Sequence, residues 1–260
     1  MRHTLFDLTG RVALITGASQ GIGFAIAQAL AGAGARVLLN GRSRDRLEQA
    51  ADRLRGEIGE NSGASIGTAC FDVTDAAAVR AGVEALLGAG ERIDILVNNA
   101  GIQRRNPLEK FDDADWDALI ACNLGSVYHV SKALAPHMIE RGSGKIINIG
   151  SVQCELARPG IAPYTATKGA VKNLTKGMCA DWAKYGLQIN AIGPGYFDTP
   201  LNKALVEDPE FDAWLRKRTP AGRWGALSDL HGAAIFLASS ASDFINGQTI
   251  YVDGGIVSVI

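Results

Sequence analysis

Three polar residues in one short stretch have the types and spacing to move a proton at an alcohol or carbonyl oxygen. Ser151 follows an apolar run at 146–149, and Tyr164 and Lys168 lie four residues apart in a helical pattern, so they share one helix face. A free phenol has a pKa of about 10, which a nearby ammonium lowers by stabilising the phenolate. A serine hydroxyl can hold the reacting oxygen by a hydrogen bond. Because a Tyr-x-x-x-Lys pair alone is also common on protein surfaces, this hypothesis needs a second motif.

These side chains converge only if the strands and helices of the chain bring them to one edge of a sheet. Apolar, β-branched runs alternate with helical patterns, which predicts a parallel sheet with right-handed crossovers and ligands at the carboxyl ends of the strands. We expect helices at 24–33, 43–59, from near 75, at 113–137, through 164–178 and at 227–239. We expect strands at 11–16, 36–40, 65–71, 93–97, 146–149, 187–191 and 247–252.

The second motif is a glycine-rich turn, GASQGIG at 17–23, between the first strand and the first helix. Glycines let the backbone approach a pyrophosphate, and the helix N-terminus supplies free N–H groups. A plain tight turn would also need glycine. The strand before the turn and the helix after it favour dinucleotide binding.

The end of the second strand indicates which dinucleotide is bound. An NAD site would place Asp or Glu there, about 20 residues beyond the glycines, on the ribose 2′-hydroxyl. The chain has Asn40, Gly41 and Arg42 instead, and Asp45 falls in the next helix. A guanidinium forms charge-assisted bonds with a 2′-phosphate, so we expect NADP rather than NAD. The alternative is that Arg42 is a solvated loop charge.

Other polar residues follow strand ends or interrupt a helix. Asp72 could contact adenine, although an acid or Thr at this point could equally cap the next helix. Arg104 and Arg105 follow the fourth strand, where a guanidinium pointing into the cleft would bind a small carboxylate; the alternative is a pair of surface charges. Asn123 stands in mid-helix, which is unfavourable without a specific role. The polar segment 196–220 is expected to act as a substrate lid.

Composition excludes several classes of protein. The 260 residues carry a net charge of -1, which gives no reason to expect nucleic acid or an anionic membrane as a partner. The four cysteines are far apart with no CxxC pair, so we expect no metal and a reducing cytoplasm. We see no signal peptide and no apolar run of about 18 residues, the length of a spanning helix. One domain, 1–260, is the simplest organisation.

The motifs together resemble the short-chain dehydrogenase/reductase family. TGASQGIG, NNAG, Asn123, Ser151, YTATK and Pro194-Gly195 occur in that family's order and spacing, over about residues 8–255. IQRR at 102–105, the stretch 151–178, PGYF at 194–197 and PAGRWG at 220–225 are similar to members that interconvert D-gluconate and 5-keto-D-gluconate. Gln20 departs from the pattern, because NADP-using relatives often carry Arg there.

The resemblance implies a Rossmann fold, a doubly wound seven-stranded parallel sheet in the order 3-2-1-4-5-6-7 with helices on both faces, and a homotetramer. Tyr164 would be the catalytic acid/base, Lys168 would bind the nicotinamide ribose and lower the pKa of Tyr164, Ser151 would hold the substrate oxygen, and Asn123 would keep a relay water. Besides Arg42, Tyr164 and Lys168, the cofactor-binding residues would be Gly17, Ser19, Gln20, Gly21, Ile22, Gly23, Asp72, Val73, Asn99, Ala100, Gly101, Pro194, Gly195, Phe197 and Thr199.

The implied reaction is hydride transfer from NADPH to the C5 ketone of 5-keto-D-gluconate, reversed at alkaline pH. We expect Arg104 to bind this sugar acid, with Gln153 and Glu155 on its hydroxyls. Other reductases of the family, for a polyol or a 3-oxoacyl thioester, would share the catalytic residues, although a neutral substrate needs no arginine. A non-catalytic dinucleotide sensor would usually lack the tyrosine or the lysine, and a scaffold role requires both motifs to be coincidences.

Overall fold

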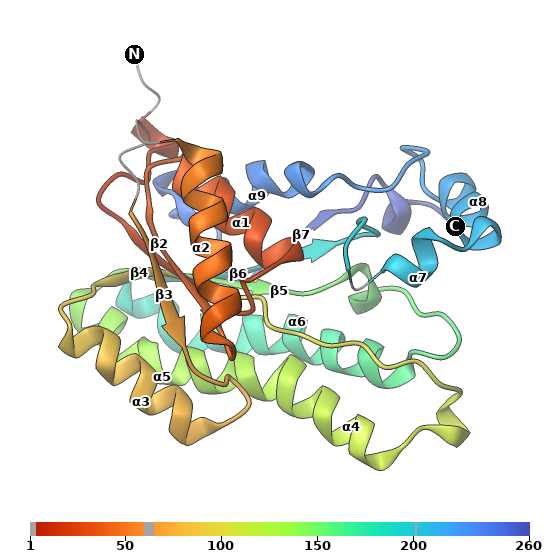
Figure 1. Ribbon diagram of the computed structural model, residues 1–260, viewed down its shortest axis with the longest axis horizontal. Coiled ribbons are helices and arrows are strands. Elements are labelled where there is room, and N and C mark those ends of the chain that lie inside the picture. The colour runs from red at the N-terminus through yellow and green to blue at the C-terminus, as the bar shows by residue number, and fades with distance from the viewer. Residues whose placement is uncertain (1–3, 60–64, 201) are drawn as a thin grey trace.

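The computed structural model describes residues 4–59, 65–200 and 202–260, and one parallel sheet crosses the molecule (Figure 1). Its seven strands run in the order β3-β2-β1-β4-β5-β6-β7, which confirms the expected topology and the single-domain Rossmann-like fold. The expected strands all form, with ends shifted by a few residues. They are β1 (Val12–Ile15), β2 (Arg36–Gly41), β3 (Ile66–Cys70), β4 (Ile93–Asn98), β5 (Gly144–Ile149), β6 (Leu187–Pro194) and β7 (Thr249–Val252).

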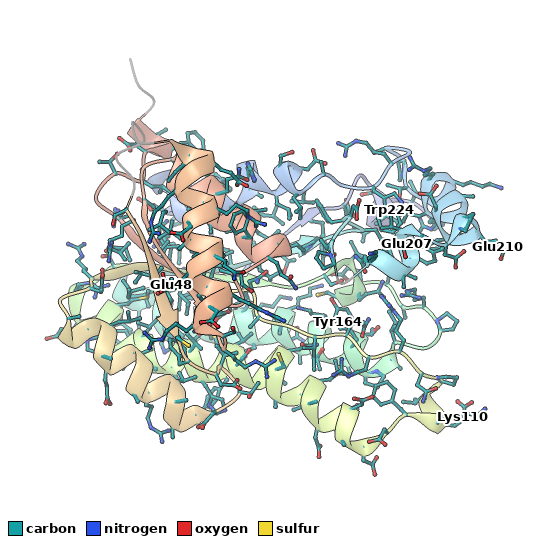
Figure 2. The ribbon with its side chains drawn as sticks, viewed as in Figure 1. Glu48, Lys110, Tyr164, Glu207, Glu210 and Trp224 are labelled. Atoms are coloured by element: carbon teal, nitrogen blue, oxygen red, sulfur yellow. The ribbon has the colours of Figure 1, made fainter. Side chains whose placement is uncertain are left out.

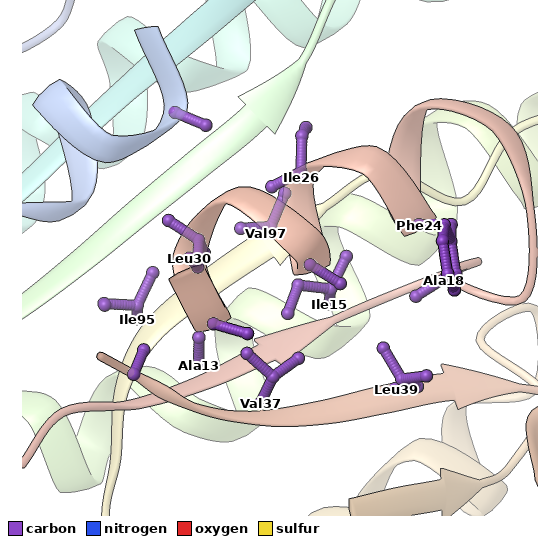
Figure 3. Packing of buried hydrophobic residues seen from close by; sticks show 14 of the residues in the cluster. Ala13, Ile15, Ala18, Phe24, Ile26, Leu30, Val37, Leu39, Ile95 and Val97 are labelled. Atoms are coloured by element: carbon purple, nitrogen blue, oxygen red, sulfur yellow. The ribbon is translucent and has the colours of Figure 1, made fainter. Parts of the chain in front are cut away.

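The central strands are apolar along their whole length because helices cover both faces of the sheet. All six residues of β4 are buried, and successive residues face opposite sides. Val97 and Ile15 pack into the cluster under one helical layer, whereas their neighbours Leu96 and Leu14 pack into the cluster under the other. Figure 3 shows the first of these clusters, in which Ile26 and Leu30 of the first helix lie over the strands.

Helices cover the sheet in two layers (Figure 1). On one face, α1 (Gly21–Gly32) contacts both α2 (Arg44–Ile58) and α9 (His231–Ala238). On the other face lie α3 (Ala76–Gly88), α4 (Asp113–Leu119), α5 (Ser126–Arg141) and α6 (Ala162–Trp182). Side-chain caps fix several starts: Ser43 accepts from the Arg46 N–H before α2, and Asp75 accepts from two N–H groups before α3.

The helix expected at 113–137 differs from expectation in its middle. A π-helical turn, Ile120–Gly125, separates α4 from α5 and carries Asn123. Such turns insert one extra residue per turn and often mark functional sites. The sequence signalled the position through the unfavourable asparagine, but not the change of helix type.

Beyond β6 the chain forms two short helices, α7 (Lys203–Val206) and α8 (Pro209–Arg218), as expected for segment 196–220; Leu201 lies outside the described residues. Both helices lie at one end of the molecule (Figure 1). Leu215 of α8 packs with Val152, Trp224 and Ile256 in a small third cluster. This segment therefore has its own apolar anchor at the carboxyl edge of the sheet.

Candidate active site

A cavity of about 820 Å³ opens at the carboxyl ends of the strands. Its wall is built from the turn between β1 and α1, the ends of β2 to β6, and segment 196–220. Figure 2 shows Tyr164 in the middle of the molecule, with Trp224 beside α7 and α8. This is the edge at which ligands of doubly wound sheets bind.

Ser151, Tyr164 and Lys168 all line this cavity. Ser151 follows β5 and is held by the N–H of Gln153, which donates to its Oγ at 3.1 Å. Tyr164 and Lys168 lie on successive turns of α6, with the Lys168 Nζ 5.7 Å from the centre of the Tyr164 ring. Lys168 is buried and donates from Nζ to the Ile149 carbonyl at 2.7 Å. The structure thus brings the three residues together.

The surroundings of these groups change their pKa values. Burial raises the pKa of Tyr164 to about 12, although a hydrogen bond with Ser151 acts in the opposite direction. Burial lowers the pKa of Lys168 to about 8. In this structure the pKa of Tyr164 therefore lies above that of a free phenol, and a lowering of it by Lys168 stays a prediction. The loss of water around the phenol outweighs its favourable contacts, because a buried phenolate is poorly solvated.

Asn123 fixes the loop behind Lys168. Its Oδ1 accepts from the Ile102 N–H at 2.8 Å, and its Nδ2 donates to the Ile102 carbonyl at 3.0 Å and to the Thr167 Oγ1 at 3.2 Å. Gly101 lies against this group, since a Cβ there would stand 3.3 Å from the Asn123 Oδ1 and 3.9 Å from the Lys168 Nζ. Asn123 thereby ties the loop after β4 to α6.

The glycine turn has the close packing that a pyrophosphate cradle requires. Gly17 has a positive φ of 62°, and a Cβ on it would lie 2.9 Å from the Ala100 Cα. The Asn99 Nδ2 donates to the Thr16 and Gly17 carbonyls, at 2.9 and 3.0 Å, which fastens the end of β4 to the turn. Within the described part of the chain no side chain caps α1, so its first N–H groups face the cavity.

Most of the expected cofactor-binding residues line the cavity, and one does not. Gly23 is buried behind the Asn99 amide and serves the packing of the turn. Those that line it, besides Tyr164 and Lys168, are Gly17, Ser19, Gln20, Gly21, Ile22, Arg42, Asp72, Val73, Asn99, Ala100, Gly101, Pro194, Gly195, Phe197 and Thr199.

The end of β2 presents positive charge to the cavity. The Arg42 Nη1 lies 3.7 Å from the Asp72 carboxylate, and Arg46, one helical turn later, also lines the wall. Burial alone would raise the pKa of Asp72, but hydrogen bonds from Thr74 and the charge of Arg42 hold it below its usual value. The sequence reasoning missed Arg46, which its spacing of four from Arg42 could have indicated.

Only some of the expected substrate-binding residues line the cavity. Gln153 is buried and lines the cavity. Arg104 reaches the rim, but its Nε binds the Asp115 carboxylate at 2.9 Å. The Glu155 carboxylate binds Lys172 and the Tyr251 hydroxyl and lies outside the cavity wall, contrary to the expected role.

Arg105, Arg158 and Tyr196 also line the cavity. The sequence indicated Arg105 as one of two adjacent arginines, but it gave no motif that pointed to Arg158 or Tyr196. Their only signal was their place in the stretches 151–178 and 194–197 that carried the closer resemblance. Within the described residues no group of His, Cys, Asp and Glu could hold a metal ion, and no helix there is long and apolar enough to cross a membrane.

Comparison with known proteins agrees with this geometry. A family model described as enoyl-(acyl carrier protein) reductase matches residues 17–257. The chain is 58% identical over 252 residues to the gluconate 5-dehydrogenase of Gluconobacter oxydans (strain 621H), covering 97% of this chain and 96% of that protein. It is 49% identical over 258 residues to the 5-keto-D-gluconate 5-reductase of Escherichia coli (strain K12), covering 99% and 100%.

A solved structure extends the likeness to three dimensions. It is a gluconate 5-dehydrogenase from Burkholderia cenocepacia J2315 in complex with NADP and tartrate, 57% identical, with a TM-score of 0.95 and 99% of each chain covered. The matched residues include the glycine turn and the Ser151, Tyr164 and Lys168 positions, which fall within 17–257. The chain therefore belongs to the short-chain dehydrogenase/reductase family.

Proposed function

We propose that the protein is an NADP-dependent oxidoreductase that reversibly reduces 5-keto-D-gluconate to D-gluconate. The observation that carries the proposal is the convergence of Ser151, Tyr164 and Lys168 beside a dinucleotide cradle, in a chain 58% identical to a gluconate 5-dehydrogenase. The 5-keto-D-gluconate 5-reductase at 49% identity supports the same substrate.

The cavity has the features that an NADP site needs. Side chains are excluded at Gly17, where a Cβ would meet the Ala100 backbone, so a pyrophosphate can approach the turn. Arg42 and Arg46 supply positive charge for a 2′-phosphate, and residues 40–44 contain no acid to bind a 2′-hydroxyl. The solved relative with NADP bound supports this choice over NAD.

Three side chains would carry out the proton transfer. A bound NADPH would supply the hydride to the carbonyl carbon. The Ser151 Oγ accepts from the Gln153 N–H, and its O–H, which bonds the Tyr164 hydroxyl in this structure, would donate to the oxygen of a bound substrate. Tyr164 would give its proton to that oxygen as negative charge develops. Lys168 uses one ammonium donor on the Ile149 carbonyl, which leaves two for the nicotinamide ribose.

The raised pKa of Tyr164 favours the reductive direction near neutral pH. A phenol with a pKa of about 12 is protonated at pH 7, so it is ready to act as the acid. Oxidation of gluconate needs the phenolate, whose population grows with pH. Because oxidation of gluconate also releases a proton, the proposed reverse reaction should be favoured in alkali.

Three further assignments belong to the same proposal. Segment 196–220 would serve as a substrate lid, supported by its position on the cavity wall and its separate apolar cluster. The protein would assemble as a homotetramer, which would cover exposed apolar residues such as Phe244 and Ile260. It would act in the cytoplasm, where its four unpaired cysteines stay reduced.

The test is NADPH oxidation, followed at 340 nm, with 5-keto-D-gluconate beside 2-keto-D-gluconate, fructose and an acetoacetyl thioester. Fast turnover of the first alone supports the proposal. Turnover of another carbonyl only would retain the catalytic residues and reject the substrate, in favour of a polyol or thioester reductase. Failure with every carbonyl would favour a dinucleotide sensor.

A further inference from the structure

Two arginines from separate loops meet at the substrate end of the cavity. Arg105 lies in the loop after β4, and Arg158 lies between the turn Val152–Cys154 and α6. The Asn106 N–H donates to the Gly160 carbonyl at 3.0 Å, so one backbone hydrogen bond fastens the two loops side by side. The guanidiniums therefore reach the cavity from neighbouring positions.

No acid among the described residues is paired with either of these charges. Burial lowers the pKa of Arg105, and the positive charge of Arg158 lowers it further, which places the two guanidiniums near one another. Among the ion pairs between described residues, none joins an acid to Arg105 or to Arg158, whereas Arg104 is paired with Asp115. Like charges brought together in a partly buried cavity favour an anion between them.

Two buried polar atoms that line this part of the cavity lack hydrogen-bond partners among the residues that the structure describes. They are the Nε donor of Arg158 and the Oε1 acceptor of Gln153, whose side chain is 6% exposed. The other amide atom of Gln153, Nε2, donates to the Tyr196 hydroxyl at 3.4 Å. Buried polar groups are normally satisfied, so this pair marks a place for a ligand that has both an acceptor and a donor.

Aromatic residues hold Arg158 in position. Its guanidinium lies 5.4 Å from the centre of the Phe211 ring on α8, and the Tyr196 ring lies 5.7 Å from Phe211. A cation over an aromatic face is attracted by the ring. Arg158 is thus placed by segment 196–220, while its Nε remains free to bind.

We propose that Arg105 and Arg158 form the carboxylate subsite of the substrate, with the Gln153 Oε1 accepting from a neighbouring hydroxyl and Tyr196 lining its side. This inference rests on the proposed reduction of a keto sugar acid and replaces Arg104 as its anchor. A guanidinium binds carboxylate through two parallel N–H groups, and the sugar-acid hydroxyl supplies the donor that Gln153 lacks.

The test compares a charged substrate with its neutral counterpart. L-Sorbose has the carbon skeleton and hydroxyl configuration of 5-keto-D-gluconate, with CH₂OH in place of the carboxylate. Arg158→Ala and Arg105→Ala should each lower kcat/KM for the acid by roughly 10- to 100-fold, chiefly through KM, because a charge-assisted hydrogen bond is lost. Turnover of L-sorbose and the KM for NADPH should change by less than about twofold.

Three further variants sharpen the comparison. Arg158→Lys keeps the charge without the planar fork, so its loss should be intermediate. Arg104→Ala decides between the two anchors, and the inference predicts little effect of this change on the acid. Arg80→Ala removes one exposed charge from α3 that does not line the cavity, and controls for net charge. Circular dichroism and NADPH titration check that each variant is folded.

Equal losses for the acid and for L-sorbose would overturn the inference, since they would indicate a general effect on folding or on Tyr164. A selective loss in Arg104→Ala alone would also overturn it. Calorimetric titration of the NADP complex with D-gluconate and with neutral D-glucitol gives the same comparison where L-sorbose is a poor substrate. If the unaltered enzyme turns over no 5-keto-D-gluconate, the proposed function fails, and the titration still tests the subsite separately.

Discussion

Replacing Gly23 by alanine tests whether the glycine turn depends on close packing rather than on local flexibility. A Cβ at this position would overlap the Asn99 amide nitrogen and would lie 2.7 Å from the Gly17 carbonyl oxygen. The amide would have to move, which would break its hydrogen bonds to the Thr16 and Gly17 carbonyls. The turn that faces the cofactor would shift with it.

The expected change in the free energy of unfolding for Gly23→Ala is the balance of opposing effects. Two lost hydrogen bonds cost about 1 kcal/mol each, and alanine in place of glycine returns up to about 1 kcal/mol of helix propensity. The overlap with a backbone oxygen adds strain, so we expect a net loss of about 2 kcal/mol. For a chain of this size such a loss lowers Tm by roughly 4–8 °C.

The assay is thermal unfolding together with NADPH titration by fluorescence. Gly32→Ala is the matched control, because it lies in the same helix and a Cβ there would meet nothing within 4 Å. We expect Gly32→Ala to keep its affinity for NADPH and to unfold at a slightly higher temperature. If Gly23→Ala behaves like Gly32→Ala, the packing argument for the glycine turn is wrong.

Three other predictions concern pH, cofactor choice and the segment beside the cavity. Because oxidation needs the Tyr164 phenolate, kcat/KM for gluconate should rise with pH by up to about tenfold per unit while reduction persists at neutral pH; a flat pH–rate profile for oxidation would contradict this. Arg42→Ala should raise KM for NADPH by about tenfold, a loss of about 1.4 kcal/mol, and leave KM for NADH unchanged, whereas Arg44→Ala should do neither; comparison of the two coenzymes checks it. Asp208→Ala removes the side chain that caps α8, and should lower the free energy of unfolding by about 1 kcal/mol in urea titration, with no such loss in Asp208→Asn.

The sequence predicted most of the fold because the relevant signals are local. The run at 93–98 is apolar throughout, which predicts a strand covered on both faces, and the glycine turn lies between a strand and a helix as a dinucleotide site requires. The spacing of Tyr164 and Lys168 predicted a shared helix face, and α6 provides it. Each of these inferences depends on neighbours within a few residues along the chain.

Other features depended on contacts between distant segments. Tyr164 has a raised pKa because the surrounding protein excludes water from it, and no sequence pattern reports that burial. Glu155 looked equivalent to Gln153, but Lys172 and Tyr251, from α6 and β7, hold its carboxylate away from the cavity. Such placements are decided by packing across the whole sheet.

The sequence by itself determined the strand and helix periods, the glycine turn and the presence of a tyrosine, a serine and a lysine as candidate catalytic residues. Only the tertiary structure decided which of two arginines at the cavity is paired with an acid. Arg104 and Arg105 are adjacent and chemically identical, yet Asp115 binds the first, while the hydrogen bond from Asn106 to Gly160 brings the second beside Arg158. The physical reason is that neighbouring side chains in a loop point in different directions, and partners more than 10 residues away in the chain fix which direction each one takes.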